Sequence, residues 1–247
     1  MPGNVMTDKE SSQEEVFDTQ YRTYGSGAQR SYPNDALIRE LAIRFFRKSP
    51  KERSEIRILE IGCGSGANLW MVAREGFDTT GSDFSSEGLK YCEETMDHWG
   101  VKAHLVHADM MSLPFEDNSF DYVFEIMAMQ HLDFEQHKVA LSEVERILKD
   151  GGEFFSYHVS ENSISFLATE ERVDHCTVPN VADGLPLSNN GQMSFLSANE
   201  ARRLLMDCGL EPGEIDREIR SYDGQKVSVE YLLIRAKKTK GERPEKR

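Results

Sequence analysis

The amino-acid sequence predicts an α/β protein built on a doubly wound, mostly parallel sheet of seven strands. Short apolar runs alternate with segments of helical spacing along most of the chain, which is the pattern of strands joined by crossover helices. In residues 57–69 one apolar run breaks into three alternate glycines and then into a helical segment. The length of 247 residues suits one domain, or one domain with a small lid.

The expected elements follow in chain order. Residues 1–50 comprise an N-terminal flap and a helix, residues 51–237 form the main domain, and residues 238–247 form a basic tail. A turn containing Asp223-Gly224 predicts that the last two strands form an antiparallel hairpin. Helices are expected at 35–47, 67–74, 85–99, 134–148 and 198–208, and strands at 57–61, 78–82, 103–107, 120–124, 153–158, 214–221 and 227–236.

Two segments lack a clear periodic pattern. Residues 17–33 hold three tyrosines, two arginines and two glycines, which indicates either a mobile flap that contacts a ligand or a surface loop packed on the domain. Residues 159–197 are polar and longer than most connections between elements. They form either a lid over a binding site or a poorly ordered insertion, and we favour the lid.

The composition argues against several partners and locations. The formal net charge of −14 repels phosphate backbones, so we expect no nucleic-acid partner. No apolar run approaches the roughly 20 residues that a membrane span requires, so we expect no membrane contact. The four cysteines lie far apart without a CxxC pair, which predicts reduced thiols, no metal site and a cytoplasmic protein. The oligomeric state is left open.

The glycine-rich turn is the clearest functional signal. Gly62, Gly64 and Gly66 lie between an apolar strand and a helix, and glycine permits both positive φ and a close approach of a ligand to the backbone. The amides exposed at the start of a helix favour an anionic group. Because this turn also fits the GxGxxA pattern of dinucleotide-binding proteins, the motif alone leaves the ligand open.

Acidic residues at three successive strand ends narrow the choice. Glu60 precedes the glycine turn, where a carboxylate would repel a pyrophosphate and attract an amino group. Asp83 could accept from ribose hydroxyls, and Asp109 could accept from the amine of an adenine. Phe84 and Met110 follow them and offer a purine an apolar face and a polarizable thioether. A ligand that contains an amino acid, a ribose and an adenine would use all of these groups.

These motifs together resemble those of the class I S-adenosylmethionine-dependent methyltransferases. The stretch 120–125, the turn that leads into it from Leu113, and the segment 144–152 are also similar to motifs of that family. The similarity follows the family's order from about Ile58 to Tyr157. The resemblance implies a Rossmann-like fold, and it makes residues 51–237 an S-adenosylmethionine-binding methyltransferase domain.

The resemblance also implies roles for the matched residues around the methionine portion of the cofactor. Gly62, Gly64 and Gly66 would let the loop wrap this portion. Glu60 would bind near its amino group, and Glu125 would lie close to the same portion. S-adenosylhomocysteine would be the product.

The remaining roles that the resemblance implies concern the nucleoside and the mouth of the cofactor site. Asp83 would hold the ribose, and Asp109 would accept from the exocyclic amine of the adenine. Phe84 and Met110 would enclose the adenine ring. The segment that ends at Tyr21 is similar to a Trp-Asp-x-x-Tyr motif of some small-molecule methyltransferases, with phenylalanine in place of the tryptophan, which assigns Tyr21 to the cofactor's mouth.

Two histidines are candidates for a general base. Methyl transfer from a sulfonium mainly requires alignment of the nucleophile and exclusion of water, and a base helps when the acceptor is a hydroxyl or an ammonium. His131 follows the fourth strand and His158 ends the fifth. Each of them could equally be a structural histidine that bonds a loop carbonyl.

The acceptor is the least determined part of the expected function. We expect an enzyme that methylates an oxygen, nitrogen or carbon nucleophile of a small metabolite, and a sugar, a phenol or an amine fits equally well. An NAD(P)-dependent oxidoreductase, which would share the first half of the fold, remains an alternative. So do a methyltransferase acting on a protein side chain and a catalytically inactive protein that binds the cofactor as a scaffold.

Overall fold

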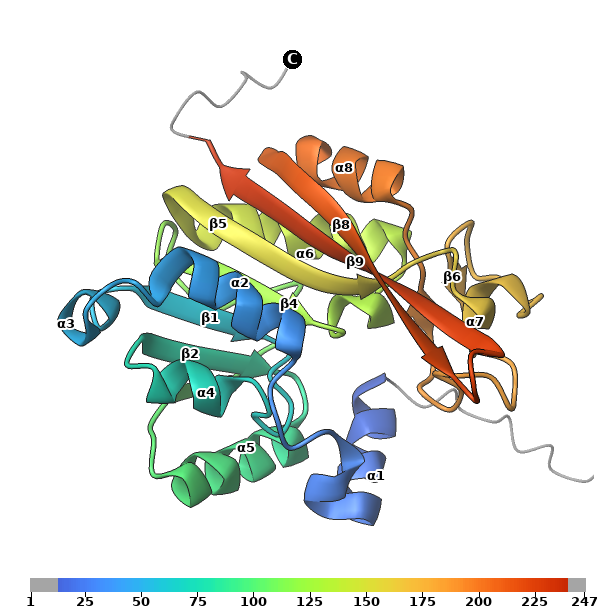
Figure 1. Ribbon diagram of the computed structural model, residues 1–247, viewed down its shortest axis with the longest axis horizontal. Coiled ribbons are helices and arrows are strands. Elements are labelled where there is room, and N and C mark those ends of the chain that lie inside the picture. The colour runs from blue at the N-terminus through green and yellow to red at the C-terminus, as the bar shows by residue number, and fades with distance from the viewer. Residues whose placement is uncertain (1–12, 240–247) are drawn as a thin grey trace, which may run out of the picture.

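A seven-stranded sheet forms the centre of the structure, a computed structural model that describes residues 13–239 (Figure 1). The strand order is β3-β2-β1-β4-β5-β9-β8; the first five strands are mutually parallel, and β9 is antiparallel to both of its neighbours. The predicted fold class and the C-terminal hairpin are therefore confirmed. The strands are β1 (Arg57–Ile61), β2 (Asp78–Asp83), β3 (His104–His107), β4 (Phe120–Ile126), β5 (Leu148–Val159), β8 (Leu210–Tyr222) and β9 (Val227–Lys238).

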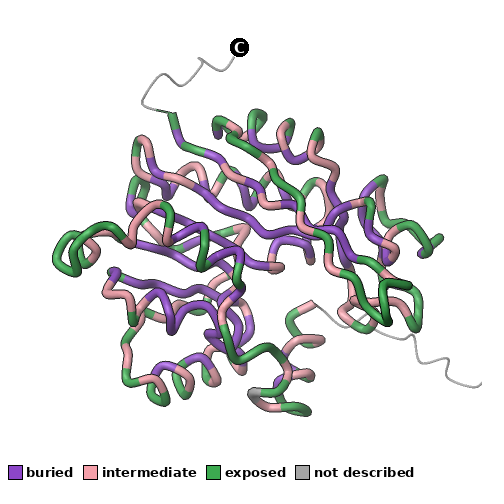
Figure 2. The backbone as a smooth tube through the Cα atoms, viewed as in Figure 1, coloured by how far each residue is buried: buried purple, intermediate pink, exposed green. Residues whose placement is uncertain are grey.

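Helices cover both faces of this sheet, and the buried residues concentrate along its strands (Figure 2). Side chains alternate between the faces of a strand, so neighbouring residues of β4 enter different cores: Phe124 packs with Leu69, and Val123 packs with Leu141. The helices are α1 (Gln13–Tyr24), α2 (Asp35–Phe45), α3 (Pro50–Arg53), α4 (Leu69–Arg74), α5 (Ser86–Trp99), α6 (Phe134–Ile147), α7 (Ile164–Leu167) and α8 (Ala198–Asp207), with short 3₁₀ turns η1 (Gly25–Ala28) and η2 (Met129–His131).

Side-chain caps set where several of these helices begin. Ser85 caps α5 by accepting from the Gly88 amide, and Ser197 begins α8 with a capping box, in which two backbone amides of the first turn gain side-chain partners. At α2 the cap is Asn34, whose side chain accepts from the Ala36 amide.

The N-terminal segment differs most from its prediction. The first half of the region interpreted as a flap or loop belongs to the helix α1, which continues into η1. Tertiary contacts hold this helix on the domain, since Ser85 Oγ donates to Asp18 Oδ1 at 2.5 Å and Tyr21 is buried. The preceding residues 1–12 and the terminal residues 240–247 lie outside the part that the structure describes.

The long segment between β5 and α8 is packed against the domain. It holds α7 and a two-stranded ribbon of β6 (Thr177–Val178) and β7 (Met193–Ser194). Val178 and Phe195 are fully buried in the same core that α4 enters. Strand β9 extends by one residue into the predicted tail, to Lys238. Lys238 is held there because its side chain is buried and its Nζ donates to the Glu145 carbonyl at 2.7 Å.

Candidate active site

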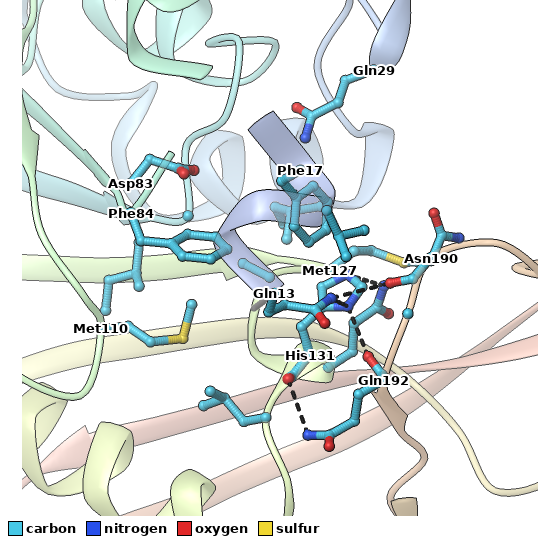
Figure 3. A pocket seen from close by; sticks show the side chains of 18 of the residues that line it. Gln13, Phe17, Gln29, Asp83, Phe84, Met110, Met127, His131, Asn190 and Gln192 are labelled. Atoms are coloured by element: carbon cyan, nitrogen blue, oxygen red, sulfur yellow. Dashed lines mark hydrogen bonds between the residues drawn. The ribbon is translucent and has the colours of Figure 1, made fainter. Parts of the chain in front are cut away.

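A large cavity lies at the carboxyl ends of the parallel strands, where open α/β sheets bind their ligands. Its volume is about 1380 Å³, which exceeds the roughly 300–1,000 Å³ of a typical small-molecule site, so two small molecules fit. Residues 60–110 line one side, called here the β1–β3 side, and residues 126–192 line the β4–β5 side. In Figure 3 Asp83, Phe84 and Met110 lie on the first side, and His131, Asn190 and Gln192 lie on the second.

The glycine turn is shaped by close approaches that only glycine permits. Gly62 has φ +68°, and a Cβ on it would lie 2.3 Å from the Cβ of Ala128. Gly66 has φ +82°, and a Cβ there would lie 2.7 Å from Cys92 Sγ. Of the three predicted glycines only Gly62 lines the cavity. Gly64 is covered, since a Cβ on it would meet the Tyr21 hydroxyl at 2.6 Å.

Glu60 is buried beneath this turn with one carboxyl oxygen unpaired. Asn68 Nδ2 donates to Glu60 Oε1 at 2.6 Å, whereas Oε2 has no hydrogen-bond partner among the described residues. Burial raises the pKa of Glu60 to about 8. Arg30 lines the cavity nearby and its charge favours the ionised carboxylate. A ligand's amino group placed here would give Oε2 a partner and replace a proton on the carboxyl group.

Asp83 ties the glycine turn to the end of β2. Its Oδ2 accepts from the Gly64 amide at 2.7 Å, and its Oδ1 accepts from the Ser85 amide at 2.8 Å. Burial raises the pKa of Asp83 to about 6. The carboxyl group lines the cavity, and each oxygen keeps a second lone pair for a ligand hydroxyl.

The other three predicted residues of the β1–β3 side also line the cavity. Phe84 and Met110 project toward each other from the ends of neighbouring strands (Figure 3), with Met110 half-buried. Asp109 is exposed, and its Oδ1 accepts from the Met111 amide at 2.8 Å. This bond fixes the orientation of the Asp109 carboxyl group, which lines the cavity.

Helix α1 brings Tyr21 over the turn. Its side chain is buried and lines the cavity, but its hydroxyl has no hydrogen-bond partner among the described residues. Burial raises the pKa of this hydroxyl, so it keeps its proton and remains a donor. Arg30 and Asn68, which the sequence motifs did not identify, lie on the same side, with Arg30 Nη2 3.4 Å from Asn68 Oδ1.

Glu125, which we expected close to the methionine portion, does not itself line the cavity. Strand β4 continues through Ile126, beyond the predicted end at 124, and the Glu125 side chain is fully buried. Its carboxyl group accepts from the amides of Ala128 and Met129 and from Ser156 Oγ. Glu125 therefore holds the backbone turn that follows β4.

His131 lines the β4–β5 side of the cavity. Its Nδ1 lies 3.0 Å from the Gln192 carbonyl, which can only accept, so this contact requires the ring hydrogen on Nδ1 and leaves a lone pair on Nε2. The side chains of Gln13 and Gln130 also contact the ring nitrogens, at 3.2 and 3.4 Å. Burial lowers the pKa of His131 to about 4, so the ring is neutral at pH 7.

His158 lies in the core and not on the cavity, which corrects its prediction as a catalytic residue. Its Nδ1 is 2.9 Å from the Val159 carbonyl, and its Nε2 is 3.5 Å from Ser194 Oγ. The ring packs on that of His137 at 5.3 Å. Side chains alternate along β5, so Tyr157 reaches the cavity and its neighbour His158 faces the opposite layer.

We expect replacement of His158 by asparagine to preserve turnover within about threefold and to reduce the acid sensitivity of the fold. Burial lowers the pKa of His158 to about 4, whereas an unfolded histidine has a pKa near 6.5. Between these values the unfolded chain binds the proton first, so stability falls as the pH drops from about 6.5 toward 4. Asparagine keeps a donor for the Val159 carbonyl but cannot titrate.

Urea denaturation at several pH values in this window tests the expectation. The wild-type chain should lose stability relative to the asparagine variant, by up to roughly 3 kcal/mol at the acid end. A large loss of turnover in the variant, with its stability unaltered, would instead show that His158 has a catalytic role.

One group of described residues brings possible metal ligands together. Atoms of Asp174, His175 and Cys176 lie within 4.8 Å of one another. Asp174 already accepts from the amides of Phe134 and Cys176, and His175 pairs with Glu200 at 2.7 Å. The ligand atoms are thus engaged within the protein, and no metal enters the function proposed below.

Comparison with known proteins finds similarity over the segment that carries the glycine turn and the strand ends described above. Residues 58–152 match a family model described as a methyltransferase domain. A demethylmenaquinone methyltransferase from Staphylococcus haemolyticus is 39% identical over 101 residues, which are 39% of this chain and 40% of that protein. The match to this relative therefore spans only about two fifths of its length. A ubiquinone biosynthesis O-methyltransferase from Dinoroseobacter shibae is 27% identical over 72% of this chain and 70% of its own length.

Among solved structures, a S-adenosylmethionine-dependent methyltransferase from Methanosarcina mazei has the same fold. The TM-score is 0.64 at 23% sequence identity, over 74% of this chain and 92% of that one. The residues matched by the family model run through β1, the glycine turn and the ends of β2 to β4, which build the β1–β3 side of the cavity. Sequence motifs, fold and family model thus agree: residues 58–152 match a methyltransferase domain, and the chain has the fold of S-adenosylmethionine-dependent methyltransferases.

Proposed function

We propose that the chain transfers a methyl group from S-adenosylmethionine to an oxygen, nitrogen or carbon nucleophile of a small acceptor. The observation that carries this proposal is the order of groups along the β1–β3 side. An unpaired carboxyl oxygen at Glu60 is followed by the carboxyl group of Asp83 and then by the Phe84–Met110 pair. This order matches an amino acid, a ribose and an adenine, and the cavity has room for a second molecule.

The chain's residues fit this donor in charge and hydrogen bonding. Glu60 would accept from the ammonium group, and Arg30 with the Tyr21 hydroxyl would donate to the carboxylate. Asp83 would accept from the ribose hydroxyls, while Asp109 would accept from the adenine amine. The support lies in the positions of these residues on one wall and in the unpaired buried atoms of Glu60 and Tyr21, since buried polar atoms in proteins are nearly always paired.

The protein's main task in such a reaction is to position the acceptor and exclude water. When bound, S-adenosylmethionine supplies a sulfonium methyl group: the acceptor's lone pair forms the new bond to carbon, and the carbon–sulfur electron pair returns to a neutral thioether. The acceptor's proton goes to His131 Nε2 or to water. His131 is neutral at pH 7 and therefore able to accept it, although a low pKa makes it a weak base.

Calorimetric titration with S-adenosylhomocysteine tests the proposed function. Saturable binding with a dissociation constant in the micromolar range is expected, and reduced nicotinamide dinucleotide should not compete. Binding of the nicotinamide cofactor alone would favour an oxidoreductase. Binding of S-adenosylhomocysteine without any transfer of labelled methyl to small molecules or to proteins would favour the scaffold.

We expect replacement of His131 by glutamine to lower kcat about 100-fold, because general-base assistance typically contributes 10²–10⁴-fold. The dissociation constant for S-adenosylhomocysteine should stay within twofold, since His131 lies on the β4–β5 side. Single-turnover methyl transfer and calorimetry measure the two effects. The asparagine variant of His158 is the matched control, and equal turnover in the two variants would remove His131 from the mechanism.

A small acceptor accords with the names of these two relatives, a demethylmenaquinone methyltransferase and a ubiquinone biosynthesis O-methyltransferase. Within residues 13–239 no helix is both long and apolar enough to cross a bilayer.

A further inference from the structure

We propose that the acceptor is an uncharged molecule that bears several hydroxyl groups, a class that includes carbohydrates. The inference rests on the proposed function and assigns the substrate class of the β4–β5 side of the cavity. It is drawn from three properties of that side: the absence of charge in its lining, its many amide side chains, and two buried polar atoms that lack close hydrogen-bond partners.

Within residues 126–192 the lining of the β4–β5 side carries no ionised side chain, although Glu14 of α1 also lines the cavity. Among its described residues, from Ile126 to Gln192, none is Asp, Glu, Lys or Arg, and burial keeps His131 neutral by lowering its pKa to about 4. An acceptor with a carboxylate, phosphate or ammonium group would face no countercharge there, and burying an unpaired charge is costly. Arg220 lines the cavity nearby, but Asp35 and Glu218 already bind its guanidinium, at 2.7 and 2.5 Å.

Amide side chains replace charges on this side. An amide supplies donors and an acceptor on one group, which suits a ligand with several hydroxyls better than an apolar ring. Apolar residues such as Leu132 and Val173 lie between them and can contact the C–H groups of such a ligand. The amide residues are Gln130, Gln136, Asn180, Asn189, Asn190 and Gln192.

Two buried polar atoms in this lining lack close hydrogen-bond partners, and one of them needs a donor whereas the other can donate. Gln130 Oε1 needs a donor and has no hydrogen-bond partner among the described residues. The Tyr157 hydroxyl can donate; it makes no close hydrogen bond in the described part of the chain, although the Glu218 carboxylate lies near it. Both side chains are at most 3% exposed. Burial raises the pKa of Tyr157, and the Glu218 carboxylate raises it further, so its proton stays in place. A hydroxyl group both donates and accepts, whereas a carboxylate only accepts and an ammonium only donates.

An apolar quinol ring fits these requirements less well. Several of these amides already bond within the protein: Gln136 accepts from the Asp133 amide, and the Asn190 and Gln192 side chains donate to the Leu187 and His131 carbonyls. The few hydroxyl groups of a quinol would still leave the remaining polar atoms of these amides without ligand partners. A site built to bond hydroxyl groups rejects ligands that lack them, because its own polar groups then stay unpaired. The acceptor's hydroxyl groups would thus determine both its binding and the atom that is methylated.

The first experiment sorts acceptors by charge. A deproteinised cell extract is separated into anionic, cationic, uncharged water-soluble and lipid fractions, and each is incubated with the chain and methyl-labelled S-adenosylmethionine. The label is expected in the uncharged water-soluble fraction, as an ether that survives mild alkali. Most label in another fraction, or no label despite binding of S-adenosylhomocysteine, would overturn the inference. Failure to bind S-adenosylhomocysteine would instead overturn the proposed function.

The second experiment isolates the Tyr157 hydroxyl. Tyr157→Phe should raise the amount of the uncharged fraction needed for half-maximal methylation about tenfold, the loss expected for one hydrogen bond. Binding of S-adenosylhomocysteine, measured by calorimetry, should not change. Tyr122→Phe is the matched control, because the Tyr122 hydroxyl is also buried and unpaired but lies off the cavity. Equal effects of the two substitutions would contradict the role of Tyr157.

Discussion

Replacing Gly62 by alanine is expected to lower the affinity for S-adenosylhomocysteine roughly 100-fold and to destabilise the fold by roughly 2–5 kcal/mol. Gly62 has φ +68°, a conformation that costs an L-residue energy, and the new Cβ would lie 2.3 Å from the Cβ of Ala128. Neither atom is the end of a flexible chain. The turn or the segment after β4 must therefore move, and both form the wall that we assign to the donor.

The control for this substitution is Gly76→Ala. Gly76 has φ +88° and no atom within 4 Å of the position of a Cβ, so it carries the backbone strain without the clash. Urea denaturation and calorimetry on both variants separate the two contributions. Equal losses of stability and unchanged ligand affinity would show that the approach of Gly62 to Ala128 has no role in binding.

Replacing Asp83 by asparagine is expected to weaken binding of adenosine 10- to 100-fold and to make it independent of pH. Adenosine is the chosen probe because it lacks the amino-acid portion and so does not engage Glu60, whose pKa is raised to about 8 by burial. A hydrogen bond to a charged acceptor is worth about 1.5–3 kcal/mol, and asparagine also leaves the Gly64 or the Ser85 amide facing an NH₂ group.

The pH dependence follows from the raised pKa of Asp83, which burial brings to about 6. Ribose hydroxyls donate to the ionised carboxylate, so adenosine affinity should rise with pH through 6 in the wild-type chain and stay flat in the variant. Asp78→Asn is the control, since Asp78 is exposed at the other end of β2. A wild-type profile without this rise would place the ribose elsewhere.

The β1–β3 side could be predicted from the sequence because its residues lie next to local signals. Gly62, Asp83 and Asp109 lie at or just after the ends of short strands, and parallel strands bring their carboxyl ends to one edge of the sheet. No long-range information was needed to place them together. The same logic located His131, which follows β4 and does line the cavity.

Two of the predicted site residues do not line the cavity, and the local sequence pattern could not show this. Glu125 and His158 were placed by their positions at strand ends, but their strands β4 and β5 extend to Ile126 and Val159. Because successive side chains of a strand point to opposite faces, the exact register decides whether a residue faces the cavity or the core. Both residues are buried away from it.

The order of strands, glycines and carboxylates by itself predicted the fold class, the resemblance to methyltransferases and the wall that we assign to the methyl donor. Tertiary structure alone decided the rest: the expected flap folds as the helix α1, Arg30 comes to lie near Glu60, and the amides of residues 180–192 line the β4–β5 side. The physical reason is how far apart in the sequence the contacting residues lie. The donor wall is built from strand ends that any parallel sheet aligns, whereas the acceptor wall depends on how two long segments without strong periodicity pack back onto the domain.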